Sequence, residues 1–329
     1  MNTFRTIVQP SNFPFKISHT DRIMCLGSCF TENIGQLLAK SKFLVLINSF
    51  GIIYNPISIC KSLDMLIDDT TISADDMIFN NDRYYHWDFH GNLSGTDPEQ
   101  NANLLNDRIQ KARQFLKETE VLFLTLGTAN AFLLKSEERI VANCHKFPND
   151  NFSRIELAVD EITVAFQSTI DKLKLINPKL KIVFTVSPVR HIRDGLINNQ
   201  LSKAKLIQTV NNLCKSIDDI FYFPSYELVM DDLRDYRFYT EDMLHINDVG
   251  LSYIWDYFKS SFFSDSTQQL IDRIWKINNE LAHKPFHPDS DKHQVFLNKL
   301  LKKINSIISE HSHIDFCKEI ALIKKQIIN

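Results

Sequence analysis

The chain has 329 residues, of which 44% are hydrophobic and 23% charged, and its formal net charge is -3. This composition is typical of a globular protein and excludes disorder over most of the chain. The small net charge, with no cluster of lysines, arginines and interleaved aromatics, argues against a nucleic-acid partner.

The six cysteines are scattered and form no C-x-x-C pair. This spacing predicts neither a zinc site nor a disulfide framework, and it favours a reducing compartment. Prolines and charges interrupt the N-terminal segment before an apolar signal region forms. No run approaches the roughly 18–20 apolar residues needed to cross a bilayer, so we expect no membrane span and a cytoplasmic location.

Short apolar runs alternate with helical patterns along most of the chain. The runs cover residues 23–27, 43–47, 121–127, 181–188 and 220–228, and the helical patterns cover residues 31–40, 103–117, 154–176 and 202–217. The runs are nearly continuous in apolar character, as expected for strands covered on both faces. Alternation with helices implies crossover connections, so we predict an α/β fold with a doubly wound, mostly parallel sheet in a flavodoxin-like three-layer sandwich.

Two regions fall outside this alternation. Residues from about 61 to 100 are polar, contain the cluster RYYHWDFHG, and are expected to form an insertion over the sheet. From residue 264 the chain carries long helical patterns at 268–283 and 291–311. We therefore expect an α/β domain over residues 1–263 and a C-terminal helical appendage over residues 264–329. The appendage is a candidate for homo-oligomer formation.

The first strand-to-helix junction carries the first candidate functional residue. Ser28 follows the run at residues 23–27 and precedes a helix. Ligand sites in open α/β sheets lie at the carboxyl ends of strands, and the first N–H groups of a helix favour a developing oxyanion. Ser28 is therefore either a nucleophile or an ordinary helix cap, which serine also forms well.

A second signal lies near the end of the α/β region, where Asp242 precedes His245 by three residues. On one turn, such a carboxylate can hold the imidazole tautomer while the other ring nitrogen faces a hydroxyl. Serine requires a base of this kind to act as a nucleophile. The combination predicts a triad of Ser28, His245 and Asp242.

At this point the sequence resembles a known family. Residues 27–31, GSCFT, match the G-S-C-F-A signature of the GSCFA domain, a branch of the SGNH/GDSL-like hydrolases, with Thr31 in place of the final alanine. Similar segments follow in order at residues 48–56, 125–129, 141–148, 185–191 and 223–248. The resemblance covers roughly residues 22–258.

The resemblance implies site residues. Ser28 corresponds to the SGNH nucleophile and its N–H to one oxyanion donor, and Gly51 stands where a second donor glycine is usual. The third donor is usually the Asn of a G-x-N-D block, but here Asn130 lies one position late. Thr128, Asn130 and Asn55 therefore remain candidates, with Thr128 preferred.

Other polar residues lie on loops at the expected carboxyl edge. His145, Arg190 and His191 are candidates for substrate binding, with hydrogen-bonded loop structure as the alternative, and Asn55 is a further candidate. His86, Trp87 and His90 form either a sugar-stacking platform or, as favoured here, packing of the insertion; a metal site there is not expected. Cys29 is a rival nucleophile, but neighbouring side chains diverge on such a turn, and we expect Cys29 to point into the packing.

The expected activity is hydrolysis of an ester through an acyl-Ser28 intermediate, with no cofactor and no metal. The wider superfamily suggests an O-acyl, perhaps O-acetyl, group on a carbohydrate as the substrate. Two alternatives remain: acyl transfer to a sugar hydroxyl by the same triad, and a non-catalytic carbohydrate-binding protein on the same fold.

Overall fold

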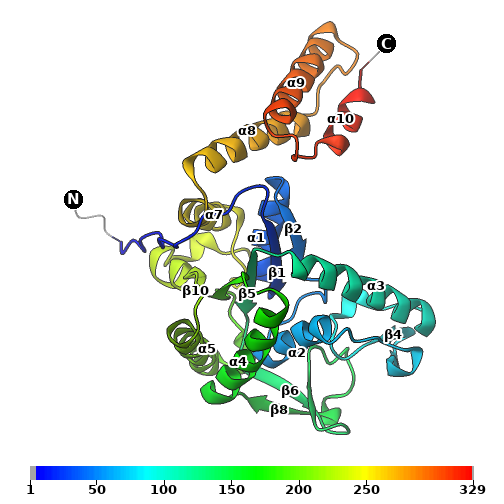
Figure 1. Ribbon diagram of the computed structural model, residues 1–329, viewed down its shortest axis with the longest axis vertical. Helices are drawn as coiled ribbons and strands as arrows, with labels where there is room; N and C mark the ends of the chain where they lie inside the picture. The colour runs from blue at the N-terminus through cyan, green and yellow to red at the C-terminus, as the bar shows by residue number, and fades with distance from the viewer. Residues whose placement is uncertain (1–4, 328–329) are drawn as a thin grey trace.

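The fold is described by a computed structural model that covers residues 5–327. Its centre is a five-stranded sheet in which every pairing is parallel. The strands are β1 (Arg22–Gly27), β2 (Leu44–Ile47), β5 (Val121–Leu126), β9 (Lys181–Val186) and β10 (Ile220–Tyr222). The predicted α/β fold with a parallel sheet is confirmed (Figure 1).

The order of the strands across the sheet is β10-β9-β5-β1-β2. The first strand of the chain is thus flanked on one side by the second strand and on the other by the third strand of this sheet. Connections from β1 and β5 leave in opposite directions across the sheet, and the crevice outside their carboxyl ends is where such folds bind ligands. Ser28 directly follows β1 and lies at this crevice.

Helices cover both faces of the sheet. The main ones are α1 (Cys29–Lys40), α2 (Pro56–Ile67), α3 (Pro98–Lys117), α4 (Val159–Ile176), α5 (Leu196–Ser216) and α7 (Asp248–Phe262), and α6 (Ser225–Glu227) is a single turn. Alternate residues of β1 enter different cores: Ile23 and Cys25 pack towards α1 and α7, whereas Met24 and Leu26 pack towards α2 to α5. Burial on both faces explains why the strands are continuously apolar.

Shorter elements lie outside this sheet. An antiparallel hairpin, β3 (Ile78–Asn80) with β4 (Arg83–Tyr85), belongs to the predicted insertion, and β6 (Asn130–Leu134), β7 (Arg139–Val141) and β8 (Phe152–Glu156) form a second antiparallel sheet. Short turns of 3₁₀ or π helix occur at Ala74–Asp76, Gly91–Leu93, Asn149–Asn151, Ile192–Asp194, Leu228–Asp232 and Tyr236–Phe238. The prediction that the helical pattern at residues 154–176 begins at residue 154 is wrong, because residues 152–156 form β8.

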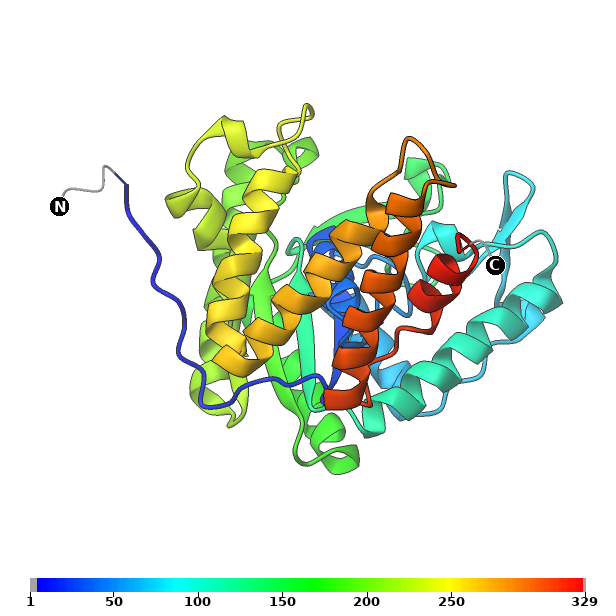
Figure 2. The same ribbon diagram turned by 90° about the horizontal axis from the view of Figure 1, so that it is seen from above.

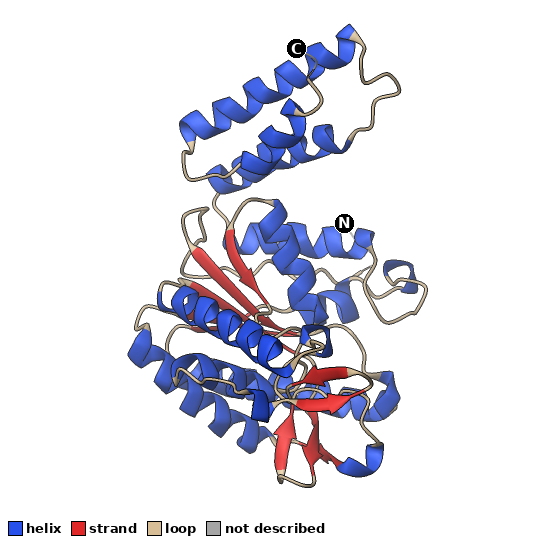
Figure 3. Ribbon diagram, turned by 90° about the vertical axis from the view of Figure 1, so that its right-hand side faces the viewer, coloured by secondary structure: helices blue, strands red, loops and turns tan. Residues whose placement is uncertain are grey.

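The C-terminal helices α8 (Asp265–Ala282), α9 (Asp291–Glu310) and α10 (Cys317–Lys324) form an arm with a small hydrophobic core of its own. Figure 3 shows this arm standing clear of the α/β body, and Figure 2 looks down on the arm with the body behind it. It is anchored at the end of α1, where Trp275 Nε1 donates to Ser41 Oγ at 2.7 Å and Asn278 donates to the carbonyl of Lys40 at 2.9 Å. Lys42 adds an ion pair to Glu319 at 2.6 Å. The predicted domain boundary at residue 263 remains a prediction.

Among residues 5–327, none of the helices combines the length and the apolar character that crossing a membrane requires.

Candidate active site

The turn between β1 and α1 places Ser28 at the switch point of the sheet. Gly27 has φ +134°, and a Cβ atom at this position would lie 2.2 Å from the carbonyl oxygen of Thr125. Only glycine fits such a close approach of two backbones. Ser28 then caps α1, since its Oγ accepts a hydrogen bond from the N–H of Phe30 at 3.3 Å. Its side chain is buried, with the residue 1% exposed.

The two backbone donors expected for an oxyanion hole already have acceptors in this structure. The N–H of Ser28 donates to the carbonyl of Thr125 at 3.2 Å, which extends the pairing of β1 with β5 by one residue. The N–H of Gly51 donates to the carbonyl of Asn48 at 2.8 Å, in a turn that Gly51 closes with φ +75°. Their role as oxyanion donors stays a prediction, and it requires these hydrogen bonds to open.

Asp242 and His245 form a tight pair on the loop before α7. The Nδ1 atom of His245 lies 2.6 Å from Oδ2 of Asp242. The other carboxylate oxygen accepts from Thr240 Oγ1 at 2.7 Å and from the N–H groups of Leu244 and His245 at 2.8 and 3.0 Å. These hydrogen bonds hold the pKa of Asp242 well below its usual range. The ionised carboxylate favours a proton on Nδ1, so Nε2 is the basic nitrogen.

Arg190 connects this loop to the carboxyl edge of the sheet. It follows β9 and donates to the carbonyl of Met243, between Asp242 and His245, and to the hydroxyl of Tyr236 at 3.3 Å. Its guanidinium lies over the ring of Tyr239, 5.0 Å from the centroid. The Asp–His pair and Ser28 therefore lie at the same edge of the sheet.

Within the described part of the chain, no hydrogen bond joins Ser28 Oγ to the imidazole of His245. The serine is buried, whereas 48% of the histidine side chain is exposed. β9, the strand that precedes Arg190, is two strands from β1, a lateral separation of about 10 Å at the usual strand spacing. The structure brings the predicted triad to one edge but does not close it.

Cys29 is partly exposed and Ser28 is buried, the reverse of the expectation for this turn. Burial raises the pKa of the Cys29 thiol. The thiol is thus protonated near neutral pH, and a protonated thiol is a weak nucleophile. The Ser28 hydroxyl is protonated under the same conditions, so this protonation does not distinguish the two residues as nucleophiles.

A buried lysine that the sequence reasoning missed lies beside Cys29. Lys203, on α5, is 1% exposed, and its Nζ donates to the carbonyls of Gly127 at 2.6 Å and Ser187 at 2.7 Å. These carbonyls directly follow the neighbouring strands β5 and β9, so the lysine clamps two strand ends. Burial lowers the pKa of Lys203 to about 7. The sequence does indicate that this lysine is buried. Lys203 lies three residues before the buried Leu206 and seven before the buried Val210, on the apolar face of its helix.

His191 and Tyr54 are half-buried and lie near this lysine and Cys29. The two rings meet edge to face with centroids 5.3 Å apart. Burial, with the nearby charges of Lys203 and Arg154, lowers the pKa of His191 to about 4. His191 is therefore neutral at physiological pH. Tyr54 was not anticipated from the sequence.

The three candidates for a side-chain oxyanion donor each have partners within the fold. Asn55 caps α2 through Ser58 and also donates to the carbonyl of Val141 at 3.4 Å. Thr128 Oγ1 lies 3.0 Å from Ser202 Oγ, and Asn130 donates to Asp194 at 2.7 Å. Loop structure accounts for all of these contacts, and a donor role for any of the three stays a prediction.

His145 packs against the insertion at residues 61–100. It is 4% exposed, its Nε2 contacts the carbonyl of His86 at 2.9 Å, and its ring packs on Tyr85 and Trp87. Burial lowers its pKa to about 4. Trp87 is likewise buried, at 6% exposure. These contacts are typical of a packed core. Packing was the favoured interpretation of the aromatic cluster that includes Trp87. In residues 5–327 no group of three or more His, Cys, Asp or Glu side chains is placed to hold a metal ion.

Comparison with protein families gives two matches. The model of the GSCFA family matches residues 22–258, which include the β1–α1 turn and the Asp242–His245 loop. The model of the C-terminal domain of GSCFA domain proteins matches residues 274–329, within the helical arm. Among curated proteins, none is similar enough to the chain to count as a relative. The first match spans well over half of the 329 residues, and the chain therefore belongs to the GSCFA family.

Proposed function

We propose that the chain is a serine hydrolase of the SGNH/GDSL-like superfamily that cleaves esters through an acyl-Ser28 intermediate. His245 Nε2 takes the proton of the Ser28 hydroxyl while Oγ attacks the ester carbonyl. The tetrahedral intermediate expels the alcohol, which receives that proton from His245. Water, activated by the same imidazole, then attacks the acyl group and releases the acid and free Ser28.

The observation that carries this proposal is the Asp242–His245 pair. A 2.6 Å contact to Nδ1 orients the imidazole, and Asp242 is itself fixed by the three further hydrogen bonds to its other oxygen. Nε2 has no hydrogen-bond partner among the described residues. An oriented imidazole with a free basic nitrogen, beside a carboxyl edge that also carries Ser28, is the arrangement that a serine nucleophile requires.

Closing the triad requires two local movements. Ser28 Oγ must rotate away from the N–H of Phe30, and the exposed histidine must turn towards the crevice. Rotation gives up one cap hydrogen bond, worth about 1 kcal/mol. It also frees the N–H of Phe30, so the start of α1 can stabilise the oxyanion in place of the occupied donors at Ser28 and Gly51.

The proposed substrate is an O-acyl group, such as an O-acetyl group, on a carbohydrate. A cavity of about 430 Å³ lies beside the Asp–His loop and is lined by polar and aromatic side chains, among them Arg190, Gln200, Tyr226, Tyr236 and Tyr239. The hydroxyls of a sugar suit such polar groups, and its apolar ring face suits tyrosine rings. Arg190 and His191 keep their proposed roles in binding, and Asn55 and His145 are less suited because both are buried in packing contacts.

Two alternatives use the same residues. Acyl transfer to a sugar hydroxyl follows the same path with water excluded from the acyl-Ser28 intermediate. A non-catalytic carbohydrate-binding protein is favoured by one observation, the missing hydrogen bond between Ser28 and His245 in residues 5–327. The proposed setting for all three is the cytoplasm.

A fluorophosphonate probe tests the proposal directly. We expect labelling of the full chain that Ser28→Ala abolishes and the neighbouring Cys29→Ala retains. Hydrolysis of p-nitrophenyl acetate should likewise fall to background in Ser28→Ala and His245→Ala. Labelling that survives in Ser28→Ala, or no labelling and no hydrolysis above the His245→Ala variant, would contradict the hydrolase and favour the binding protein.

A further inference from the structure

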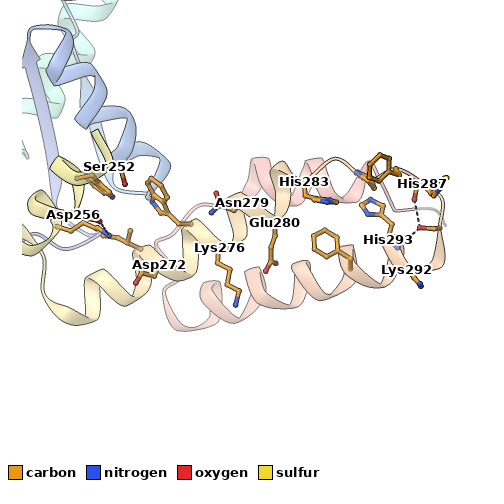
Figure 4. A pocket seen from close by; sticks show the side chains of 18 residues that line it. Ser252, Asp256, Asp272, Lys276, Asn279, Glu280, His283, His287, Lys292 and His293 are labelled. Carbon is orange, nitrogen blue, oxygen red and sulfur yellow. Dashed lines mark hydrogen bonds and ion pairs between the residues drawn. The ribbon is translucent and has the colours of Figure 1, made fainter. Parts of the chain in front are cut away.

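A large groove runs along one side of the arm, away from the candidate active site. It has a volume of about 1050 Å³ and extends from α7, at Trp255 and Lys259, along α8 to the loop at Phe286 and His287 (Figure 4). Its walls are mainly apolar and include Trp275 and Phe296. Grooves of this kind on a protein surface mark sites of association.

The polar residues of α8 on this side have an ordered charge pattern. Asp265 and Asp272 lie in the first half of the helix, and Lys276 and His283 lie in the second half or just beyond it. All four residues are exposed, and none of their side chains has a partner elsewhere in residues 5–327. The spacing of seven, four and seven residues keeps them on one face of the helix.

The other charged residues of α8, Arg273 and Glu280, are already paired within the arm. Arg273 forms two hydrogen bonds to Glu310 of α9, at 2.6 and 2.8 Å. Glu280 is paired with Lys303 of α9 at 2.6 Å. Of the charged residues of α8 that line the groove, Glu280 is thus paired within the arm, whereas Asp272 and Lys276 have no ion-pair partner in residues 5–327.

This pattern is complementary to itself. Two copies of α8 can lie antiparallel, related by a two-fold axis that crosses the helices at the level of residue 274. Asp272 of each copy then faces Lys276 of the other, and Asp265 faces His283. Ile274 is at the middle of the 18-residue helix, which is about 27 Å long, so both ends overlap. A two-fold interface requires the same patch on both partners to match in this way.

The apolar parts of the groove match under the same symmetry. Phe286 follows the end of α8 and is 97% exposed. At the other end of the groove, Trp255 and Ile271 line the corner between α7 and α8. The antiparallel arrangement brings Phe286 of each copy to this corner of its partner. We propose that a second copy of this chain occupies the groove, in a two-fold dimer built on antiparallel α8 helices.

Charge reversal tests the dimer by sedimentation velocity of the full chain over a range of concentrations. Asp272→Lys places two lysines opposite each other, and Lys276→Asp places two aspartates opposite each other. Because each contact occurs twice in a two-fold dimer, either change should raise the dimer dissociation constant about tenfold or more. The double variant Asp272→Lys/Lys276→Asp restores both pairs and should dimerise like the wild type.

Mixing provides the sharpest outcome. Equal amounts of Asp272→Lys and Lys276→Asp, each monomeric alone, should form a heterodimer, because all contacts between the two chains are then attractive. Lys318→Asp, on α10 outside the groove, is the matched control and should leave dimerisation unchanged. A wild-type chain that stays monomeric at all concentrations overturns the proposal and leaves the groove to another partner. A dimer whose dissociation constant is unchanged in both charge-reversal variants overturns the proposal as well, since the interface must then lie elsewhere.

Discussion

Asp242 accepts four hydrogen bonds, and the shortest of them, 2.6 Å long, comes from Nδ1 of His245. All four donors lie within the same short loop, at the side chain of Thr240, at Leu244 and at the backbone and ring of His245. The carboxylate therefore fixes the shape of the loop and the tautomer of the imidazole at the same time. Replacing it allows these two effects to be separated.

Asp242→Asn should lower kcat by about 10²- to 10⁴-fold while the chain stays folded. The amide oxygen can still accept the backbone N–H groups, but the amide favours the wrong imidazole tautomer. Hydrolysis of p-nitrophenyl acetate and a thermal melt measure the two effects. Glu241→Gln is the matched control, because Glu241 is an exposed neighbour whose side chain has no hydrogen bond or ion pair within residues 5–327, and it should keep full activity. Equal kinetics in both variants would mean that Asp242 does not orient the base.

The same carboxylate gives a prediction for stability against pH. Its hydrogen bonds keep the folded pKa below the unfolded value of about 3.9, so its contribution is fully present above that value. The contribution is lost as the pH falls from there through the folded pKa. The difference in melting temperature between wild type and Asp242→Asn should thus shrink as the pH falls below about 4. A difference that vanishes near pH 6 would contradict the assignment.

Arg190→Met should reduce kcat/KM by about tenfold or more with little loss of stability. The arginine holds the carbonyl of Met243 and stacks on Tyr239, so its loss frees the loop that carries the proposed base. Arg193→Met, on the same connection but exposed, is the control. If both variants have the same kcat/KM as the wild type, the anchoring of the loop has no part in the activity.

Lys203→Met should destabilise the chain, and more so at alkaline pH. The substitution leaves the carbonyls of Gly127 and Ser187 unpaired, at about 1–3 kcal/mol for each buried group. The folded pKa of about 7 lies below the unfolded value of about 10.4, so in this range only the unfolded chain binds the proton. Stability of the wild type relative to Lys203→Met should therefore rise between about pH 7 and 10.

A neutral amine retains two N–H groups, one for each carbonyl, so the clamp survives deprotonation. Urea unfolding at several pH values measures the difference between wild type and Lys203→Met. A difference that stays flat or falls over this range would show that Lys203 is charged in the folded chain at all of these pH values.

Gly27→Ala should cost about 3 kcal/mol or more in the free energy of unfolding. The added Cβ would lie 2.2 Å from a backbone oxygen of β5, and φ +134° is strained for alanine. Gly91→Ala is the matched control, because its Cβ would meet only ordinary contacts, the nearest at 3.6 Å. Equal effects of the two substitutions in urea unfolding would mean that the β1–α1 turn is not constrained as described.

The fold class was predictable because burial on both faces makes the central strands continuously apolar. β8 was mistaken for the start of a helix, since Ile155, Ala158 and Val159 recur at steps of three and one, which continue the pattern of α4. β6 and β7 are short and lie outside the main sheet, so they carry neither a long apolar run nor a clear alternation.

For the candidate site, the sequence allowed the prediction of individual residues but not of the contacts between them. Ser28 and the Asp242–His245 pair are visible because their spacing and position reflect local turns. The acceptor of the Ser28 N–H, the carbonyl of Thr125, belongs to a distant segment, and the acceptor of the Gly51 N–H, the carbonyl of Asn48, depends on the shape of a local turn. Lys203 and Tyr54 join the site through tertiary packing, and only the place of Lys203 on an apolar stripe hinted at it.

Helix α1 begins at the proposed nucleophile and ends where the arm is attached. Its 12 residues make a rod about 18 Å long between Ser28 and the Ser41 contact with Trp275. Cutting the chain after α7 would consequently strip the far end of this rod of its hydrogen bonds and expose the aromatic surface at Trp255. A shortened protein that loses reactivity at Ser28 would then report a disturbed helix, and the arm need not touch the substrate to have that effect.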